Sequence, residues 1–130
     1  MEQPLYTITQ ASERLGVSVR KIKYYCGLGL VPGIKRTRSG YRELTEEQTN
    51  HLSTLLWLRR CGFKMSAVRK YAALQRQGDA TNPQRVAILT TKKRQLWQDY
   101  EELQAQIDFL ERQISWLESE QTAGTQTGQF

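Results

Sequence analysis

The sequence predicts a mostly α-helical protein in which a small N-terminal domain is followed by one long helix. Three patterns lead to this prediction. Two short helical segments meet at a glycine near residue 16, a basic hairpin pattern follows them, and apolar residues then recur every three or four positions as far as about residue 120. The small domain cannot cover so long an apolar stripe, which predicts that the chain dimerises.

The first two helices carry local start and stop signals. Thr7 is placed to cap a helix in which Gln10 is the return partner of a capping box, and Gly16 suits the C-terminal stop. Ser18 can cap the second helix directly after this turn. Two short helices joined by so tight a turn predict a helix-turn-helix motif.

The rest of the N-terminal domain, expected to span residues 1–77, adds a wing and two helices. Residues 34–36 and 41–43 can pair as short strands around "TRSG". A second capping box, made by Thr45 and Gln48, starts a third helix that ends at Gly62. Its buried face is predicted to hold Leu52, Leu55 and Leu56. A fourth helix is predicted over about residues 65–76.

The long helix is predicted over residues 83–120, with residues 78–82 as a linker before it and residues 121–130 as a flexible tail. Asn82 and Pro83 form a typical cap and first helical residue. Five heptads then place one residue after another at the seam of a coiled coil. The residues predicted to form the dimer are Leu89, Leu96, Tyr100, Leu103, Ile107, Leu110, Ile114 and Leu117.

Charges along this helix favour an antiparallel pair. Residues 92–94 are basic, whereas Glu111, Glu118 and Glu120 lie near the other end, so antiparallel pairing sets opposite charges side by side. In such a pair the end of each helix approaches the N-terminal domain of its partner. Phe109 and Trp116 flank the seam, and we expect them to pack there.

The two parts of the chain differ in charge. Residues 1–82 contain 14 Lys and Arg residues against 6 Asp and Glu, whereas residues 83–130 contain 5 against 7. Every Lys, Arg, Asp or Glu between Glu13 and Glu43 is basic. This asymmetry indicates a polyanionic partner; the alternative is a basic surface that serves solubility.

The second helix separates a cationic face from an apolar face. At 100° per residue, the outer face holds Arg20, Lys23, Tyr24 and Gly27, and the opposite face holds Val19, Ile22, Tyr25 and Cys26. An arginine here suits a guanine edge in the major groove of double-stranded DNA, and the other polar groups suit phosphates. A solvated basic helix is the alternative. The candidate DNA-binding residues are Ser18, Arg20, Lys21, Lys23, Tyr24, Lys35, Arg36, Arg38, Tyr41 and Arg42.

Three segments resemble, in order, the MerR-type transcriptional regulators: "YTITQASERLGVSVRKIKYYCGLGLVPGIKRTRSGYREL", "LWLRRCGFKMSAVRKY" and the heptad helix. The resemblance covers about residues 5–120 and is to a short subgroup without a C-terminal effector domain. It implies a homodimer with an antiparallel dimerisation helix that binds an inverted repeat in a promoter whose spacer is too long. The dimer would bend and underwind this DNA, and so act on RNA polymerase indirectly.

The resemblance also implies residue roles. Arg20, Lys23 and Tyr24 correspond to contacts of the recognition helix, Arg36, Tyr41 and Arg42 correspond to wing contacts, and residues 64–69 open a helix pair near the DNA. Lys23 stands where the family commonly has Arg, and Cys26 where it commonly has Glu. Lys64 replaces a capping Ser, which we expect to cost the fourth helix about 1 kcal/mol.

A signal-sensing site is harder to predict. Residues 62–130 contain no Cys or His, so we expect no metal site of the kind that metal-sensing members carry, and no cofactor. Members that respond to aldehydes or thiol stress use a cysteine in the third helix, where alignment on Gly62 places Trp57. Cys61 has basic neighbours that favour a thiolate and is the candidate redox residue; packing at a helix end is the alternative. Cys26 is expected to be a structural thiol.

Other classes of protein are disfavoured. The chain has no Gly-rich phosphate loop, no paired carboxylates in a plausible cleft and no candidate catalytic triad, so we do not expect an enzyme. It has neither a signal peptide pattern nor a long apolar run, so we expect a cytoplasmic protein without a membrane partner. A stress-responsive promoter regulator and an architectural DNA-bending protein without an effector, like an excisionase or a segregation factor, both remain open.

Overall fold

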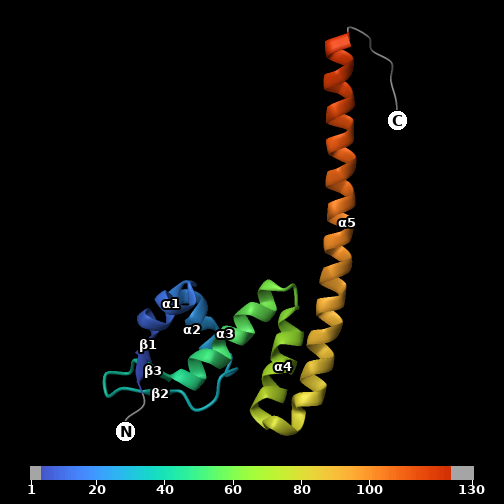
Figure 1. The fold of residues 1–130 in the computed structure, drawn as a ribbon. Helices are drawn as coiled ribbons and strands as arrows, with labels where there is room; N and C mark the ends of the chain where they lie inside the picture. Colours follow the sequence, from blue (N-terminus) through green and yellow to red (C-terminus); the bar gives the residue numbers. More distant parts are fainter. Residues whose placement is uncertain (1–3, 124–130) are drawn as a thin grey trace. The chain divides into compact units, whose positions relative to one another are not determined.

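The computed structural model describes residues 4–123 and confirms the mostly α-helical prediction (Figure 1). Contacts divide the chain into two compact units, one ending at Val86 and one beginning at Ala87. The elements, in chain order, are β1 (Leu5–Thr7), α1 (Ile8–Leu15), α2 (Val19–Gly27), β2 (Lys35–Arg36), β3 (Arg42–Thr45), α3 (Glu46–Arg60), α4 (Met65–Gln77), the 3₁₀-helix η1 (Asp79–Thr81) and α5 (Asn82–Ala123).

The helix-turn-helix motif forms as its local signals predict. The Thr7 hydroxyl accepts a hydrogen bond from the Gln10 backbone N–H at 3.1 Å, and the Gln10 side chain accepts one from the Thr7 N–H at 2.9 Å. Gly16 ends α1 with φ of 68°, a left-handed conformation that favours glycine. The Ser18 hydroxyl caps α2 by accepting from the Lys21 backbone N–H.

The predicted wing is confirmed, and the sheet to which it belongs has a third strand that the sequence did not reveal. Strands β2 and β3 pair antiparallel, with Lys35 opposite Glu43 and Arg36 opposite Arg42. Strand β1 pairs with the other edge of β3, so the strand order is β1-β3-β2. Strand β1 has three residues and its partner lies far along the chain, so it is too short for an alternating apolar and polar pattern to predict it.

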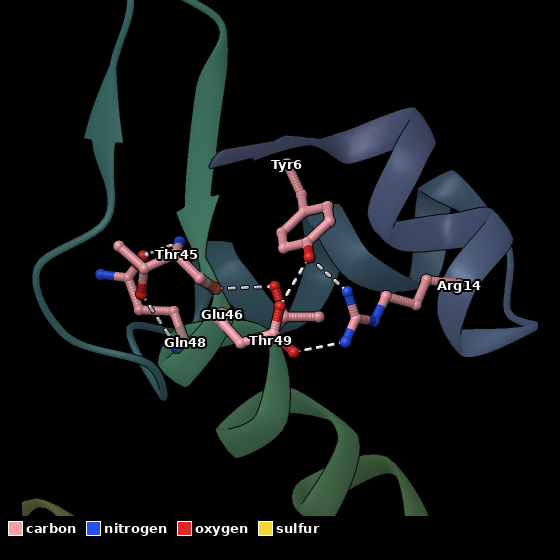
Figure 2. A network of polar contacts seen from close by, with 6 residues as sticks. All are labelled: Tyr6, Arg14, Thr45, Glu46, Gln48 and Thr49. Carbon is pink, nitrogen blue, oxygen red and sulfur yellow. Dashed lines mark hydrogen bonds and ion pairs between the residues drawn. The ribbon is translucent and has the colours of Figure 1, made fainter. Parts of the chain in front are cut away.

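A polar network joins β1, α1 and the start of α3 (Figure 2). The Tyr6 hydroxyl donates to Glu46 Oε2 at 2.6 Å and accepts from Arg14, whose guanidinium also forms an ion pair with Glu46. The hydrogen bond to Glu46 is the largest of the effects that raise the pKa of Tyr6. The three side chains therefore hold the first helix of the motif to the sheet and to α3.

Helix α3 starts at the predicted capping box, but its buried face differs from the predicted one. Gln48 N–H donates to the Thr45 hydroxyl at 3.1 Å, and the Gln48 side-chain oxygen accepts a hydrogen bond from the Thr45 N–H at 2.9 Å. Leu52 and Leu55 are fully buried, as predicted, whereas Leu56 is only partly buried and Leu58 takes its place in the core. The sheet and α4 both contact α3, so the covered face is not a single straight stripe.

The core lies within the first unit, and helices α1 to α4, strand β3 and the loop after α2 contribute to it. The buried apolar residues of that core are Ala11, Ile22, Tyr25, Leu30, Val31, Leu44, Leu52, Leu55, Leu58, Val68, Tyr71 and Ala72.

The connection to α5 is more regular than a linker. Residues 79–81 form η1, in which buried Thr81 donates to the carbonyls of Leu74 and Gly78 at 2.8 Å. The prediction that Asn82 caps α5 is wrong, because its φ of −52° and ψ of −46° are already helical. Its side chain instead accepts from Arg85 at 2.5 Å. The η1 turn thus leads directly into α5.

Helix α5 has 42 residues and is about 63 Å long at 1.5 Å per residue. It continues to Ala123, three residues past its predicted end, and the rest of the predicted tail, residues 124–130, lies outside the described residues. Every residue predicted to form the dimer is exposed in the single chain. No helix within residues 4–123 combines the length and apolar character needed to span a bilayer.

Candidate nucleic-acid interface

Helix α2 presents a cationic face that is fixed from beneath by its core residues. Ile22 is fully buried and Tyr25 is 2% exposed, while Arg20, Lys23 and Tyr24 are exposed. The Tyr25 hydroxyl donates to the Met65 sulfur at 3.7 Å, which ties α2 to the start of α4. The side chains predicted to contact DNA therefore project from a helix whose opposite face is anchored.

The predicted core face of α2 is narrower than the wheel suggested. Val19 and Cys26 are partly buried rather than fully buried. Burial is the largest effect on the Cys26 thiol and raises its pKa, while the charge of Arg42 lowers it. Cys26 belongs to α2 and Arg42 to β3, the second strand of the wing.

The wing exposes most of the predicted contact residues. Lys35, Arg36 and Arg38 are exposed, and Tyr41 is 73% exposed. Arg36 donates to the Gly40 carbonyl at 2.8 Å, which holds its side chain against the hairpin turn. Gly40 adopts φ of 86°, a conformation that a residue with a Cβ rarely takes, so this turn depends on glycine.

Three of the ten candidate residues are placed differently from the others. Arg42 is partly buried rather than exposed. The Ser18 hydroxyl already serves as the α2 cap. Lys21 lies outside the face formed by Arg20 and Lys23 and lines a cavity against α3. On the helical wheel, Lys21 lies 100° from Arg20 and 160° from Lys23, so it projects beside their face rather than from it.

Among the residues that the structure describes, the cations of α2 and of the β2–β3 hairpin form no ion pair with a carboxylate. Within residues 4–123, the ion pairs join Arg14 to Glu46 and His51 to Glu47, and neither involves this surface. Uncompensated cations beside exposed Tyr24 and Tyr41 form a surface suited to a polyanion that also offers flat or apolar groups. Double-stranded DNA has this chemistry.

The remaining predicted features lie outside helix α2 and the wing. Lys64 begins α4 without a side-chain cap bond, as predicted from the missing Ser. Cys61 is partly buried after the last residue of α3, where its N–H donates to the Trp57 carbonyl at 2.8 Å. Within the described range, no three His, Cys, Asp or Glu side chains gather in a way that could hold a metal ion.

Comparison with known proteins identifies the family. The model of the MerR HTH family regulatory proteins matches residues 6–75, which is more than half of the chain and includes both the helix-turn-helix and the wing. The chain belongs to the MerR family. It is a transcriptional regulator with the DNA-binding domain of that family.

MerR-family relatives cover most of the chain. An uncharacterised HTH-type transcriptional regulator of Haemophilus influenzae is 25% identical over 92% of this chain and 89% of its own length. A probable heavy metal-dependent transcriptional regulator of the same organism is 30% identical over 85% and 81%. These relatives are transcriptional regulators rather than enzymes.

Solved structures agree with the fold. A putative MerR family transcriptional regulator from Listeria monocytogenes has a TM-score of 0.77 and 30% identity over 92% of this chain and 90% of its own. HiNmlR, a MerR family regulator lacking the sensor domain, was solved bound to promoter DNA. It has a TM-score of 0.79 and 24% identity over 94% and 92% of the two chains.

Proposed function

We propose that this MerR-family chain binds an inverted-repeat operator as a homodimer and controls transcription initiation by distorting promoter DNA. The observation that carries the proposal is the uncompensated cationic surface formed by α2 and the β2–β3 hairpin. One α2 helix reads one half-site, so a two-fold operator requires two copies. The likeness to HiNmlR, which was solved bound to promoter DNA, supports this choice of partner.

Each part of the surface has a proposed role. Arg20 reads a base edge in the major groove, because a guanidinium can donate two parallel hydrogen bonds to guanine. Lys23 and Tyr24 hold the adjacent phosphates. The wing residues Arg36, Tyr41 and Arg42 hold the backbone beside the recognition helix. RNA polymerase is affected through the bent DNA rather than by contact.

Helix α5 binds the second copy of the chain in this proposal. Its seam residues from Leu89 to Leu117 are exposed in one chain, which leaves a long apolar stripe in water unless another chain covers it. A redox role for Cys61 stays a prediction within this proposal. A thiol oxidant that changes operator binding of the unsubstituted chain but not of the Cys61→Ser variant would support it, and equal responses would exclude it.

Footprinting of genomic DNA fragments tests the proposal. The Arg20→Ala variant is expected to lose about 1–3 kcal/mol of binding free energy at the operator, whereas Arg94→Ala, which removes an exposed cation of α5, leaves binding unchanged. Protected sites between −35 and −10 elements support promoter control. Clustered sites away from promoters would favour an architectural protein, and equal effects of the two variants would contradict the assigned surface.

A further inference from the structure

A cavity of about 500 Å³ lies within the N-terminal unit, between the turn that joins α1 to α2 and one face of α3. This volume is in the range of small-molecule sites in proteins. Its apolar lining residues are Leu15 and Val17 at the turn and Leu56 and Trp57 on α3. Neither Leu56 nor Trp57 belongs to the buried core, so the cavity offers apolar surface to an occupant.

The turn between α1 and α2 forms a fixed wall of this cavity. The Gly16 and Val17 backbone N–H groups both donate to the Ser12 carbonyl, at 2.9 and 3.2 Å. The Ser12 hydroxyl in return donates to the Val17 carbonyl at 2.5 Å. A wall that is already held in place does not have to be ordered when a ligand binds, which lowers the entropic cost of binding.

The charged lining of the cavity is positive. Its charged residues, Lys21, Arg59 and Arg60, are all cations. Arg59 donates to the Phe63 carbonyl at 2.9 Å, which holds its side chain at the end of α3. Within residues 4–123, neither Lys21 nor Arg60 forms an ion pair with a carboxylate. Two exposed cations from different helices beside one cavity favour an anionic group between them.

Trp57 and Arg60 indicate which kind of anion suits the cavity. Trp57 is 55% exposed, and the Arg60 guanidinium lies 4.5 Å from the centre of its ring. A guanidinium over a ring uses its flat face, so its in-plane N–H groups can donate two parallel hydrogen bonds to a carboxylate. An aromatic ring on the same ligand gains a specific contact with Trp57 beyond the burial of its area. The pair therefore favours an aromatic carboxylate.

We propose that this cavity binds a small aromatic carboxylate, whose carboxylate group pairs with Arg60 and Lys21 and whose ring packs against Trp57 and Leu56. Lys21 lies in the first turn of α2, so the bound anion adds a negative charge beside the recognition helix. This charge opposes the binding of DNA phosphates, and the ligand is therefore expected to weaken operator binding. The effect on the operator rests on the proposed function, whereas the site itself does not.

Isothermal titration of the full chain with naphthalene-2-carboxylate, in the absence of DNA, tests the site. Saturable binding is expected. Arg60→Ala is expected to raise the dissociation constant roughly threefold to tenfold, because it removes a charge-assisted hydrogen-bond donor. Naphthalene-2-carboxamide has nearly the same shape without the charge, and it is expected to bind more weakly than the carboxylate. An amide that binds as tightly as the carboxylate would overturn the proposed anion site.

Lys21 and Lys23 provide a matched pair of variants on one helix. Lys21→Ala is expected to weaken carboxylate binding roughly threefold to tenfold. Lys23→Ala is expected to leave it unchanged, because Lys23 does not line the cavity. Trp57→Ala is expected to weaken binding roughly tenfold, and Trp57→Phe to retain much of the affinity. Equal effects of the two lysine variants, or no saturable binding to the full chain, would overturn the site.

Operator binding separates the site from the proposed function. With saturating naphthalene-2-carboxylate, the operator dissociation constant is expected to rise roughly twofold to fivefold over its value in sodium chloride of the same ionic strength. Arg60→Ala should reduce this rise. An unchanged operator affinity in a chain that binds the carboxylate would overturn the effect on DNA binding. A chain that binds the carboxylate but no operator would instead overturn the proposed function and leave the site intact.

Discussion

The N-terminal unit and helix α5 solve the burial of apolar side chains in opposite ways. The unit encloses its apolar residues, with Ile22, Leu52 and Leu55 fully buried, whereas α5 leaves its seam from Leu89 to Leu117 exposed. The hydrophobic effect stabilises the unit within one chain, but it stabilises the seam only when another chain covers it. The comparison teaches that the residues that enclose a core and the exposed residues of the proposed dimer lie in separate parts of this sequence.

Charged residues in the seam of α5 should have the largest effect of all the variants, because they should abolish the proposed dimer. Replacing Leu103 and Leu110 with Asp is expected to give monomers, because four carboxylates would be buried in each dimer. Sedimentation velocity would show the halved mass. Ala105→Asp, at a heptad position facing away from the seam, is expected to remain dimeric. An unchanged mass for the double variant would contradict the coiled-coil assignment.

A cavity in the core should act on folding rather than on assembly. Leu52→Ala is expected to lower the free energy of unfolding by about 2–5 kcal/mol, since the deleted side chain is fully buried. Urea denaturation measures the loss. Leu5→Ala, at a half-exposed position, is the matched comparison and should cost much less. Equal losses would show that the N-terminal unit lacks the core described above.

Substitutions at helix caps should change the stability of the N-terminal unit by less, and they can either lower or raise it. Thr45→Ala removes the α3 capping box and is expected to lower stability by about 1 kcal/mol. Lys64→Ser is expected to raise stability by about 0.5–1 kcal/mol, because α4 begins without a side-chain cap bond. Thermal unfolding compares both variants with the unsubstituted chain. A loss of stability in Lys64→Ser would contradict the assignment of an empty cap.

The packing of Cys26 should have the smallest effect, which is a change in the reaction rate of its thiol. Burial raises the pKa of Cys26, so less thiolate forms at a given pH in the folded chain than in the unfolded chain. In a Cys61→Ser variant, iodoacetamide at pH 8 is therefore expected to react more slowly with the folded protein than with the protein in urea. Equal rates would show that Cys26 is not protected by packing.

Features carried by neighbouring residues could be predicted from the sequence. Each of these features depends on residues within a few positions of one another. They are the two capping boxes, the glycine that ends α1, the β2–β3 hairpin and the heptad helix. The pairing of β1 with β3 and the Tyr6–Arg14–Glu46 network join residues up to 40 positions apart, and no local pattern marks them. The exchange of Leu56 for Leu58 and the separate place of Lys21 depend on tertiary packing.

In the candidate site too, local features could be predicted from the sequence and tertiary ones could not. The wheel of α2 correctly gave Ile22 and Tyr25 as buried and left Arg20, Lys23 and Tyr24 outside. It could not show that Trp57 and Arg60 stack beside a cavity, because that arrangement needs α1, α2 and α3 together. The sequence did contain one signal for an apolar surface on α3, the adjacent residues Leu56 and Trp57. A helix with one buried stripe rarely buries two adjacent side chains.

The salt dependence of operator binding tests the central claim most directly. If α2 and the hairpin of two copies neutralise about 6–10 phosphates, affinity is expected to fall roughly 10³- to 10⁵-fold between 50 and 200 mM salt. Lys23→Ala should make the logarithmic slope shallower by about two, because each dimer loses two phosphate contacts. A slope near zero, or one that Lys23→Ala leaves unchanged, would contradict the assignment of this surface to DNA.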